Sequence, residues 1–233
     1  MKILISFISI LLFSGLSAQD FRDYYYYPQK IPSKQYVHLV SLAMANLPED
    51  FVEEGSTMIR GPLFGFKASY GLPYNFSADG NFTTNIVTFQ FSLGPKWRYE
   101  IDQHWALALG FDFSYVFGQL RHYGYDSKIT TWMSYPNASI GYKFSKFSVS
   151  LKVEGIFIAD LKTKQDDVEL TKEYDGISGI AFGVYIEQRL WKDHYLTLGL
   201  KNNYTEFYYP AWAVFPTFDR IFWIPEFFIG LAL

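Results

Sequence analysis

The feature that most constrains this chain is a two-residue alternation, in which one side of each extended stretch is apolar and the other side carries the charge. Seven stretches show it, and residues 87–101 show it most clearly. Their odd positions are Val87, Phe89, Phe91, Leu93, Pro95, Trp97, Tyr99 and Ile101, and their even positions are Thr88, Gln90, Ser92, Gly94, Lys96, Arg98 and Glu100. The aromatic-rich apolar side suits a surface that faces lipid, while the charged side requires an interior. The pattern predicts an all-β fold, a transmembrane antiparallel up-and-down β-barrel.

The composition agrees with this fold and excludes several classes of function. Of the 233 residues, 21% are aromatic and 18% are charged, which is rich in aromatics and poor in charge for a globular domain. The formal net charge of −3 provides no basic surface, so we expect no nucleic-acid partner. The chain has no cysteine, which excludes disulfides, thiolate metal sites and thiol nucleophiles. We expect no cofactor and no metal.

Residues 1–18 have the features of a secretory signal peptide. Lys2 supplies the positive start, residues 3–13 form an apolar run, and small residues precede Gln19. The alternative is a membrane anchor helix, but the run is too short to cross ~30 Å of hydrocarbon comfortably. No other stretch approaches the ~20 apolar residues of a spanning helix, so further insertion requires strands.

The links between the extended stretches alternate between short and long. Outer-membrane barrels of bacteria have short periplasmic turns, long external loops and an even number of strands. We therefore predict eight strands, with both chain ends on the periplasmic side. The strands are residues 61–73, 85–101, 105–117, 129–144, 147–159, 177–190, 195–204 and 221–233. The long links are residues 74–84, 118–128, 160–176 and 205–220.

Charged residues in the predicted strands all share the inward side. A Lys or Arg on the lipid side near the middle of the membrane costs ~2–4 kcal/mol, so a bilayer would enforce this segregation. We expect these side chains to form an ion-pair network in the lumen. They are Lys67, Lys96, Arg98, Glu100, Asp112, Lys143, Lys152, Glu154, Glu187, Arg189, Lys201 and Glu226.

Residues 19–60 have no clear place in an eight-stranded barrel, and we expect them to form a periplasmic extension. Residues 36–44 read almost equally well as a strand or as a short helix that Ser33 begins. A barrel of ten strands that uses this region is the alternative. The predicted organisation is thus a signal peptide (1–18), an extension (19–60) and the barrel (61–233).

The chain resembles the small outer-membrane β-barrel proteins of Gram-negative bacteria, the OmpA/OmpX-like group. The resemblance covers about residues 61–233 and rests on the alternation, the spacing of the turns and segments such as Lys96-Trp97-Arg98-Tyr99-Glu100-Ile101. It implies a location in the outer membrane and contact with lipid and lipopolysaccharide. The group includes adhesion proteins, structural anchors, conduits and a few lipid A-modifying enzymes, so function stays open. The final Leu233 departs from the terminal aromatic residue that is common in the group.

Two regions carry the functional hypotheses. An eight-stranded lumen leaves little room beyond its side chains. We therefore predict that the ion pairs of the inward charged residues close the lumen. The alternative is a narrow conduit for ions or solutes. In the loop at residues 205–220, exposed aromatic residues indicate a protein partner, a lid or membrane contact, or else they prolong the barrel wall. The loop binding candidates are Tyr208, Tyr209, Trp212 and Phe215.

Other loops carry weaker signals. His122 lies in an external loop near Asp126 and Ser127, which is the set of groups that a lipid A-modifying hydrolase or acyltransferase would use. The acidic loop at residues 160–176 could bind a divalent cation, or it could be a solvated loop. We predict a non-enzymatic barrel that is structural or binds a surface partner through its external loops, with a conduit and an enzyme as alternatives.

Overall fold

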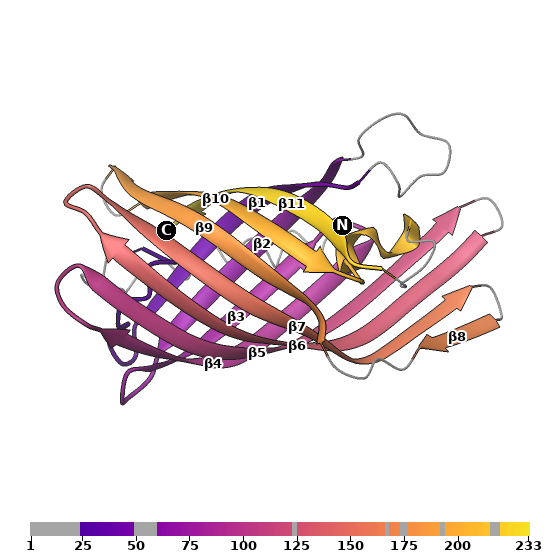
Figure 1. Cartoon of the computed structure of the whole chain (residues 1–233), viewed down its shortest axis with the longest axis horizontal. Coiled ribbons are helices and arrows are strands. Elements are labelled where there is room, and N and C mark those ends of the chain that lie inside the picture. The colour runs from indigo at the N-terminus through magenta and orange to yellow at the C-terminus, as the bar shows by residue number, and fades with distance from the viewer. Residues whose placement is uncertain are drawn as a thin grey trace, which may run out of the picture.

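The computed structural model describes residues 24–48, 60–122, 125–165, 168–172, 177–191, 194–214 and 220–233. The predicted signal peptide, residues 1–18, lies outside the described residues. The chain forms one antiparallel sheet that closes on itself, because β1 pairs with both β2 and β11 (Figure 1). The elements are β1 (Tyr36–Asn46), β2 (Arg60–Gly71), β3 (Phe76–Thr84), β4 (Thr88–Glu100), β5 (Trp105–His122), β6 (Tyr125–Lys143), β7 (Phe147–Gln165), β8 (Val168–Lys172), β9 (Ile177–Trp191), β10 (His194–Thr205), the 3₁₀-helix η2 (Tyr209–Val214) and β11 (Phe222–Ala232).

The barrel wall has ten strands, so the prediction of eight is wrong. β8 is not part of the wall, because it pairs only with β7 while the wall continues from β7 to β9. The two additional wall strands are β1 and β3. β1 lies in the predicted periplasmic extension. It includes residues 36–44, for which the pattern fitted a strand and a helix almost equally well. β3 lies inside a predicted long loop.

β3 was missed because its outward side is weakly apolar. Ala78 and Gly80 hold the central outward positions, so the alternation has little contrast there. The inward position between them is Asp79, which is buried. β3 pairs along its whole length with β2 and β4, and these ladders decide its structure where local pattern does not.

The turns beside β3 are tight. Tyr74 and Asn75 precede the strand with φ angles of 61° and 65°, in the left-handed region that a two-residue hairpin turn of type I′ uses. Ile86 follows the strand with a φ of 80°. Residues 74–84, predicted as a long external loop, therefore contain the strand β3, which has a short turn at each end.

The outward side of the wall is apolar over its height. Leu93, near the middle of β4, is 66% exposed, and large apolar side chains on the neighbouring strands are exposed with it. Others in this set are Phe91, Leu109, Phe113, Val153, Ile180, Phe182, Leu198 and Phe227. Tyr99 and Trp105, also exposed, flank the turn at residues 101–104, where an interfacial aromatic belt belongs. An apolar exterior of this extent requires hydrocarbon around it.

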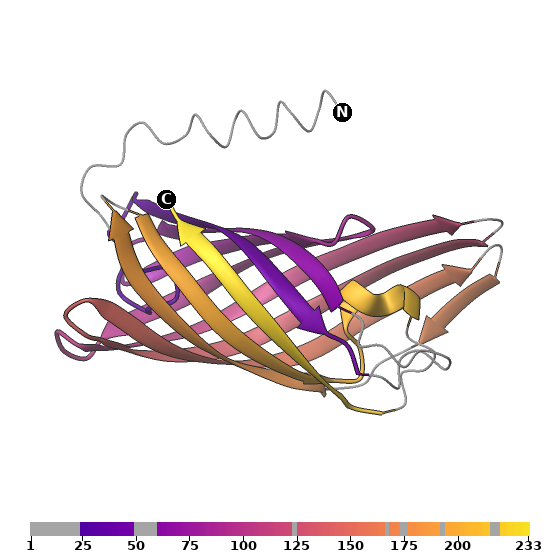
Figure 2. The same cartoon turned by 90° about the horizontal axis from the view of Figure 1, so that it is seen from above.

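The two ends of the barrel differ. The C-terminus, the start of the described chain and the turns at residues 72–75, 101–104 and 144–146 lie at one end, which we take as periplasmic (Figure 2). At the other end β5, β6 and β7, with 18, 19 and 19 residues, extend past the wall together with β8 (Figure 1). Among the described residues, no helix is both long enough and apolar enough to cross a bilayer.

Candidate functional site

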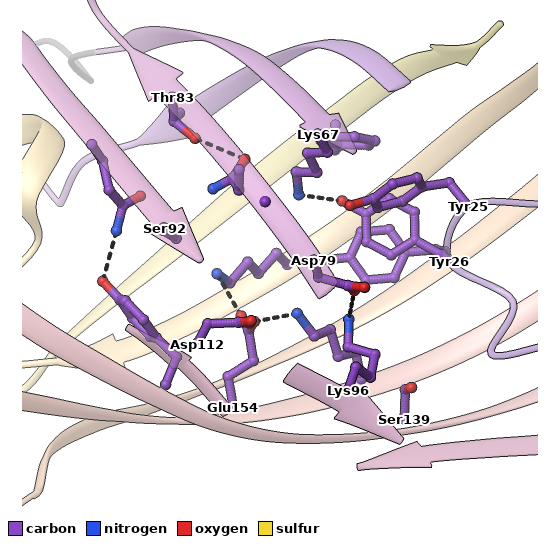
Figure 3. Close-up of a pocket in the computed structure, with 18 of the residues that line it drawn as sticks. Tyr25, Tyr26, Lys67, Asp79, Thr83, Ser92, Lys96, Asp112, Ser139 and Glu154 are labelled. Atoms are coloured by element: carbon purple, nitrogen blue, oxygen red, sulfur yellow. Dashed lines mark hydrogen bonds and ion pairs between the residues drawn. The ribbon is translucent and has the colours of Figure 1, made fainter. Parts of the chain in front are cut away.

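The barrel interior holds a polar cavity of about 130 Å³ (Figure 3). Seven strands contribute charged side chains to it, five cationic and four acidic among the described residues. The residues are Lys67, Asp79, Lys96, Arg98, Asp112, Lys152, Glu154, Lys201 and Glu226. Charges survive away from bulk water only when they are paired and hydrogen-bonded, so their partners decide what the cavity can do.

Asp79 is the centre of one ion cluster. Its carboxylate accepts hydrogen bonds from Arg98 Nη2 at 3.1 and 3.2 Å and from Lys96 Nζ. Ser77 Oγ donates to Asp79 Oδ1 at 2.7 Å. The β3–β4 register produces this cluster, because Asp79 lies opposite Gly94, and Lys96 and Arg98 follow that glycine on the same inward face of β4. The result is a buried carboxylate between two cations.

Glu154 is the centre of the second cluster. Lys152 Nζ lies 2.5 Å from Glu154 Oε1, and Lys201 Nζ lies 2.8 Å from Glu154 Oε2. Both lysines are opposite Gly183, one across the β7–β9 ladder and the other across the β9–β10 ladder. A glycine between two long side chains lets both reach the same carboxylate.

The remaining cavity charges have neutral hydrogen-bond partners. Asn137 Nδ2 donates to Asp112 Oδ2 at 3.0 Å, and the Tyr208 hydroxyl donates to Glu226 Oε2 at 3.1 Å. Lys67 Nζ donates to the Tyr26 hydroxyl at 2.6 Å. No carboxylate of the described residues lies within ion-pair distance of Lys67.

The periplasmic mouth is filled by residues 24–27, which we call the N-terminal plug. Glu187 accepts the backbone N–H groups of Tyr25, Tyr26 and Tyr27 at 2.8–3.0 Å. The Tyr26 ring stacks on Tyr185 with 3.7 Å between ring centroids. Burial raises the pKa of the Tyr26 phenol well above its usual value, so the plug presents a neutral hydroxyl to the cavity.

The external mouth is filled by residues 207–214, which we call the external cap. Trp212 Nε1 donates to Thr88 Oγ1 at 2.8 Å, and Asn85 Nδ2 donates to the Pro210 carbonyl at 2.5 Å. Phe207 and Tyr208 are also buried. The predicted exposure of this aromatic loop is therefore wrong for Tyr208 and Trp212, while Tyr209 is partly buried and Phe215 lies outside the described residues.

The structure brings eight of the twelve predicted lumen residues to the cavity and places four elsewhere. Glu100 is exposed at the periplasmic rim, where it accepts the Lys30 backbone N–H at 3.0 Å. Lys143 lies over the Tyr24 ring, with its Nζ 5.6 Å from the centroid. Glu187 binds the plug, and Arg189 is exposed at the end of β9.

Sequence reasoning missed Asp79 and the plug tyrosines. The signal for Asp79 was the inward series Ser77, Asp79, Asn81 and Thr83, which alternates with Phe76, Ala78, Gly80 and Phe82. The run Tyr24-Tyr25-Tyr26-Tyr27 has no periodicity that connects it to Glu187. Only the closed barrel brings these groups together.

The described residues do not form the side-chain arrangement that a catalytic site or a metal site would need. No described histidine side chain is hydrogen-bonded to a serine or a carboxylate, and the side chain of His122 lies outside the described part. In the acidic loop, Asp160 pairs with Lys162 at 3.1 Å. Within the described ranges, no cluster of three or more His, Asp or Glu side chains could hold a metal ion.

Among solved structures, several outer-membrane proteins are similar to this chain at low identity and low TM-score. No protein-family model matches the chain, and no curated protein matches it in sequence. The KdgM porin in complex with disordered oligogalacturonate is 10% identical with a TM-score of 0.42, over 85% of this chain and 98% of that chain. Ail, the attachment invasion locus protein of Yersinia pestis, is 11% identical with a TM-score of 0.40, over 86% of this chain and 97% of that chain.

Outer membrane phospholipase A from Escherichia coli is 10% identical with a TM-score of 0.39, over 94% of both chains. Identities this low concern the fold alone. The class follows from the barrel's own geometry, which has a closed antiparallel wall, an even number of strands, an apolar exterior and a charged interior. The chain is a small outer-membrane β-barrel.

Proposed function

We propose that the protein is a non-enzymatic barrel of the Gram-negative outer membrane, with a closed lumen and a structural or binding role for its external hairpins. The observation that carries this proposal is that the chain's own segments fill both mouths. The N-terminal plug binds Glu187 at one end, and the external cap binds Thr88 at the other. Segments of the chain in both mouths oppose the passage of ions through the lumen.

The charges of the interior support a closed lumen. Five cations and four carboxylates line the cavity among the described residues. Asp79 and Glu154 each hold two of these cations. A largely paired set fills space between strands without requiring a flow of counter-ions.

The binding role belongs to the strands that project beyond the external rim. β5 and β6 continue as a paired ladder to the pair His122 and Tyr125, and β7 continues into β8. Their surface carries exposed ion pairs, such as Arg121 with Asp126 at 3.0 Å. Polar hairpins above an apolar belt suit contact with lipopolysaccharide headgroups or with a protein partner.

Planar-bilayer recording tests the closed lumen. We expect the purified full-length protein to show no steady conductance across a range of voltages and salt concentrations. A stable open channel in the unmodified protein would refute the proposal. Pull-down on lipopolysaccharide-coated beads, with and without the tips of the two hairpins, tests the binding role, and equal retention would argue against it.

A narrow conduit is the second candidate, and the cavity is the observation that favours it. Its volume of about 130 Å³ exceeds the ~10–15 Å³ of probe-occupied space that one water needs, so the lumen has room for several waters between its two closures. If the protein conducts, Arg98→Ala should change the ion selectivity, because Arg98 is one of the charges that line the cavity. A selectivity that Arg98→Ala leaves unchanged would place the path elsewhere.

A further inference from the structure

We propose that the N-terminal plug is removable, and that its withdrawal opens the cavity to the periplasm as a binding site for a small anionic solute. The plug is not a strand of the wall. Its backbone N–H groups bond to the side chain of Glu187, whereas the neighbouring wall strands bond through continuous ladders. It can therefore leave without breaking the barrel.

The segment between the plug and β1 is fixed to the barrel wall. The Lys34 N–H donates to the Gly71 carbonyl at 2.9 Å, and the Gly71 N–H donates to the Gln35 carbonyl at 2.8 Å. Lys34 has a φ of 71°, which turns the chain sharply at this point. Any side chain at Gly71 would collide with the carbonyl oxygens of Ile31 and Pro32. Everything from Ile31 onward is thus anchored, and the plug is tethered to a defined point.

The Glu187 carboxylate has hydrogen-bond donors both when the plug fills the mouth and when the plug has left it. In the occupied state it is fully buried, and its oxygens accept N–H groups from the plug and the Thr197 hydroxyl at 3.2 Å. In the vacated state the mouth opens to the aqueous periplasm, so water replaces the N–H donors. A carboxylate that exchanges one set of donors for another avoids the large cost of an isolated buried charge.

The external cap has anchors of its own on the barrel wall. These anchors are Thr88, Asn85 and Glu226, all on or beside the wall. Tyr208 and Ala211 of the cap also share one buried apolar cluster with the plug tyrosines, but the hydrogen bonds that hold the cap go to the wall and stay when the plug leaves. Withdrawal of the plug therefore opens one end only. The result is a chamber that faces the periplasm, not a channel.

The chemistry of the opened chamber favours an anion. Lys67 donates to the Tyr26 hydroxyl and lies 5.0 Å from the centroid of the Tyr26 ring, so both contacts are lost when the plug leaves. The other cavity cations that contact carboxylates keep Asp79 or Glu154. Lys67 then faces the opening as a cation without a carboxylate partner, and a small anion supplies the missing charge.

Cysteine accessibility tests the inference directly, because the native chain has no cysteine. Ser139 lines the cavity, so Ser139→Cys places a single thiol there. The full-length variant is reconstituted into oriented vesicles, and a membrane-impermeant anionic thiol reagent is added to one side. Adding Glu187→Gln, which removes charge-assisted bonds to the plug, should speed labelling from the periplasmic side about 10- to 100-fold.

Three comparisons make the result decisive. A cationic reagent of equal size should gain less from Glu187→Gln than the anionic one, and Lys67→Met should abolish that difference. Glu206→Gln, the same change at the external end, should leave labelling unaltered. No acceleration by Glu187→Gln, or equal acceleration from both sides of the membrane, would overturn the inference.

Two further measurements separate folding and conductance from the effect of the plug. If Glu187→Gln does not fold, Tyr26→Ala tests the same point, because it removes the ring stacked on Tyr185 and keeps the backbone bonds to Glu187. Faster periplasmic labelling of this variant is expected, and unchanged labelling contradicts the removable plug. In planar bilayers Glu187→Gln should stay non-conducting because the cap is closed. Conductance in that variant alone refutes the one-sided chamber, whereas conductance in the unmodified protein refutes the closed lumen.

Discussion

Glu187 holds Tyr26 through both oxygens of its carboxylate, each 3.0 Å from the Tyr26 backbone nitrogen. The two residues are 161 positions apart in the chain. Because Glu187 lies on β9 and its neighbour Thr197 lies on β10, the receptor for the plug exists only after these late strands join the wall. Closure of the periplasmic mouth therefore follows assembly of the barrel.

Loss of the Asp79 carboxylate should be costly. Asp79→Ala leaves Arg98 and Lys96 without their buried counter-charge, which is expected to lower the free energy of unfolding by about 3–5 kcal/mol. The control is Asp160→Ala, where the partner Lys162 is exposed and the expected change is about 0–1 kcal/mol. Urea unfolding in lipid vesicles measures both. Equal changes in the two variants would contradict the buried cluster.

The lipid face should reject charge according to depth. Leu93→Arg places a cation near the middle of β4 on the outward side and is expected to destabilise the barrel by about 2–4 kcal/mol. Ile101→Arg, which lies at the periplasmic turn, should cost about 0–1 kcal/mol. Unfolding in vesicles again provides the measurement. If Leu93→Arg is tolerated, water and not hydrocarbon bathes this side.

Two glycines should respond oppositely to an added methyl group. At Gly94 a Cβ would collide with the Phe111 carbonyl oxygen on β5, so Gly94→Ala is expected to cost about 1–3 kcal/mol. At Gly80 the nearest atoms are 4.0 Å away, and Gly80→Ala should be neutral or slightly stabilising. Thermal unfolding in detergent compares the pair. A neutral Gly94→Ala would mean that β4 and β5 approach less closely than the structure shows.

The turn at residues 101–104 should carry a pH-dependent contribution to stability. The backbone N–H groups of Trp105 and His104 both donate to Asp102 Oδ1 at 2.7 Å and lower the pKa of its carboxyl. A lowered pKa stabilises the folded turn above the unfolded value of about 3.9, and this contribution is lost as the pH falls through the folded pKa. The stability difference between the unmodified protein and Asp102→Asn should therefore be present at neutral pH and shrink in acid. If the stability difference between the two proteins is the same at neutral pH and in acid, the Asp102 carboxylate does not make this pH-dependent contribution.

The sequence predicted the class of the barrel because its strongest strands carry their own contrast. In β4, Leu93 and Trp97 alternate with Lys96 and Arg98, and no partner strand is needed to see which side meets lipid. β3 offered no such contrast, since Ala78 and Gly80 are small, and its structure depends on ladders to β2 and β4. Local pattern therefore undercounts strands wherever the lipid face uses small residues.

The candidate site was also predicted from the sequence only in part. Lys152, Glu154 and Lys201 were predicted to face inward from their own strands, and they meet in one cluster. Their grouping depends on registers that the alternation does not contain, because a shift of two residues preserves every inward side chain and changes every neighbour. Asp79 joined the site only when β3 became a strand.

The sequence by itself determined which side of each strong strand faces lipid, because successive side chains of a strand point to opposite faces whatever its partners are. The tertiary structure alone decided that the wall closes with ten strands, since closure requires β1 to pair with β11 across nearly the full length of the chain. It also decided that four tyrosines and an aromatic loop fill the two mouths. Their contacts, Glu187 for the plug and Thr88 for the cap, are set by distances in space and not by any spacing along the chain.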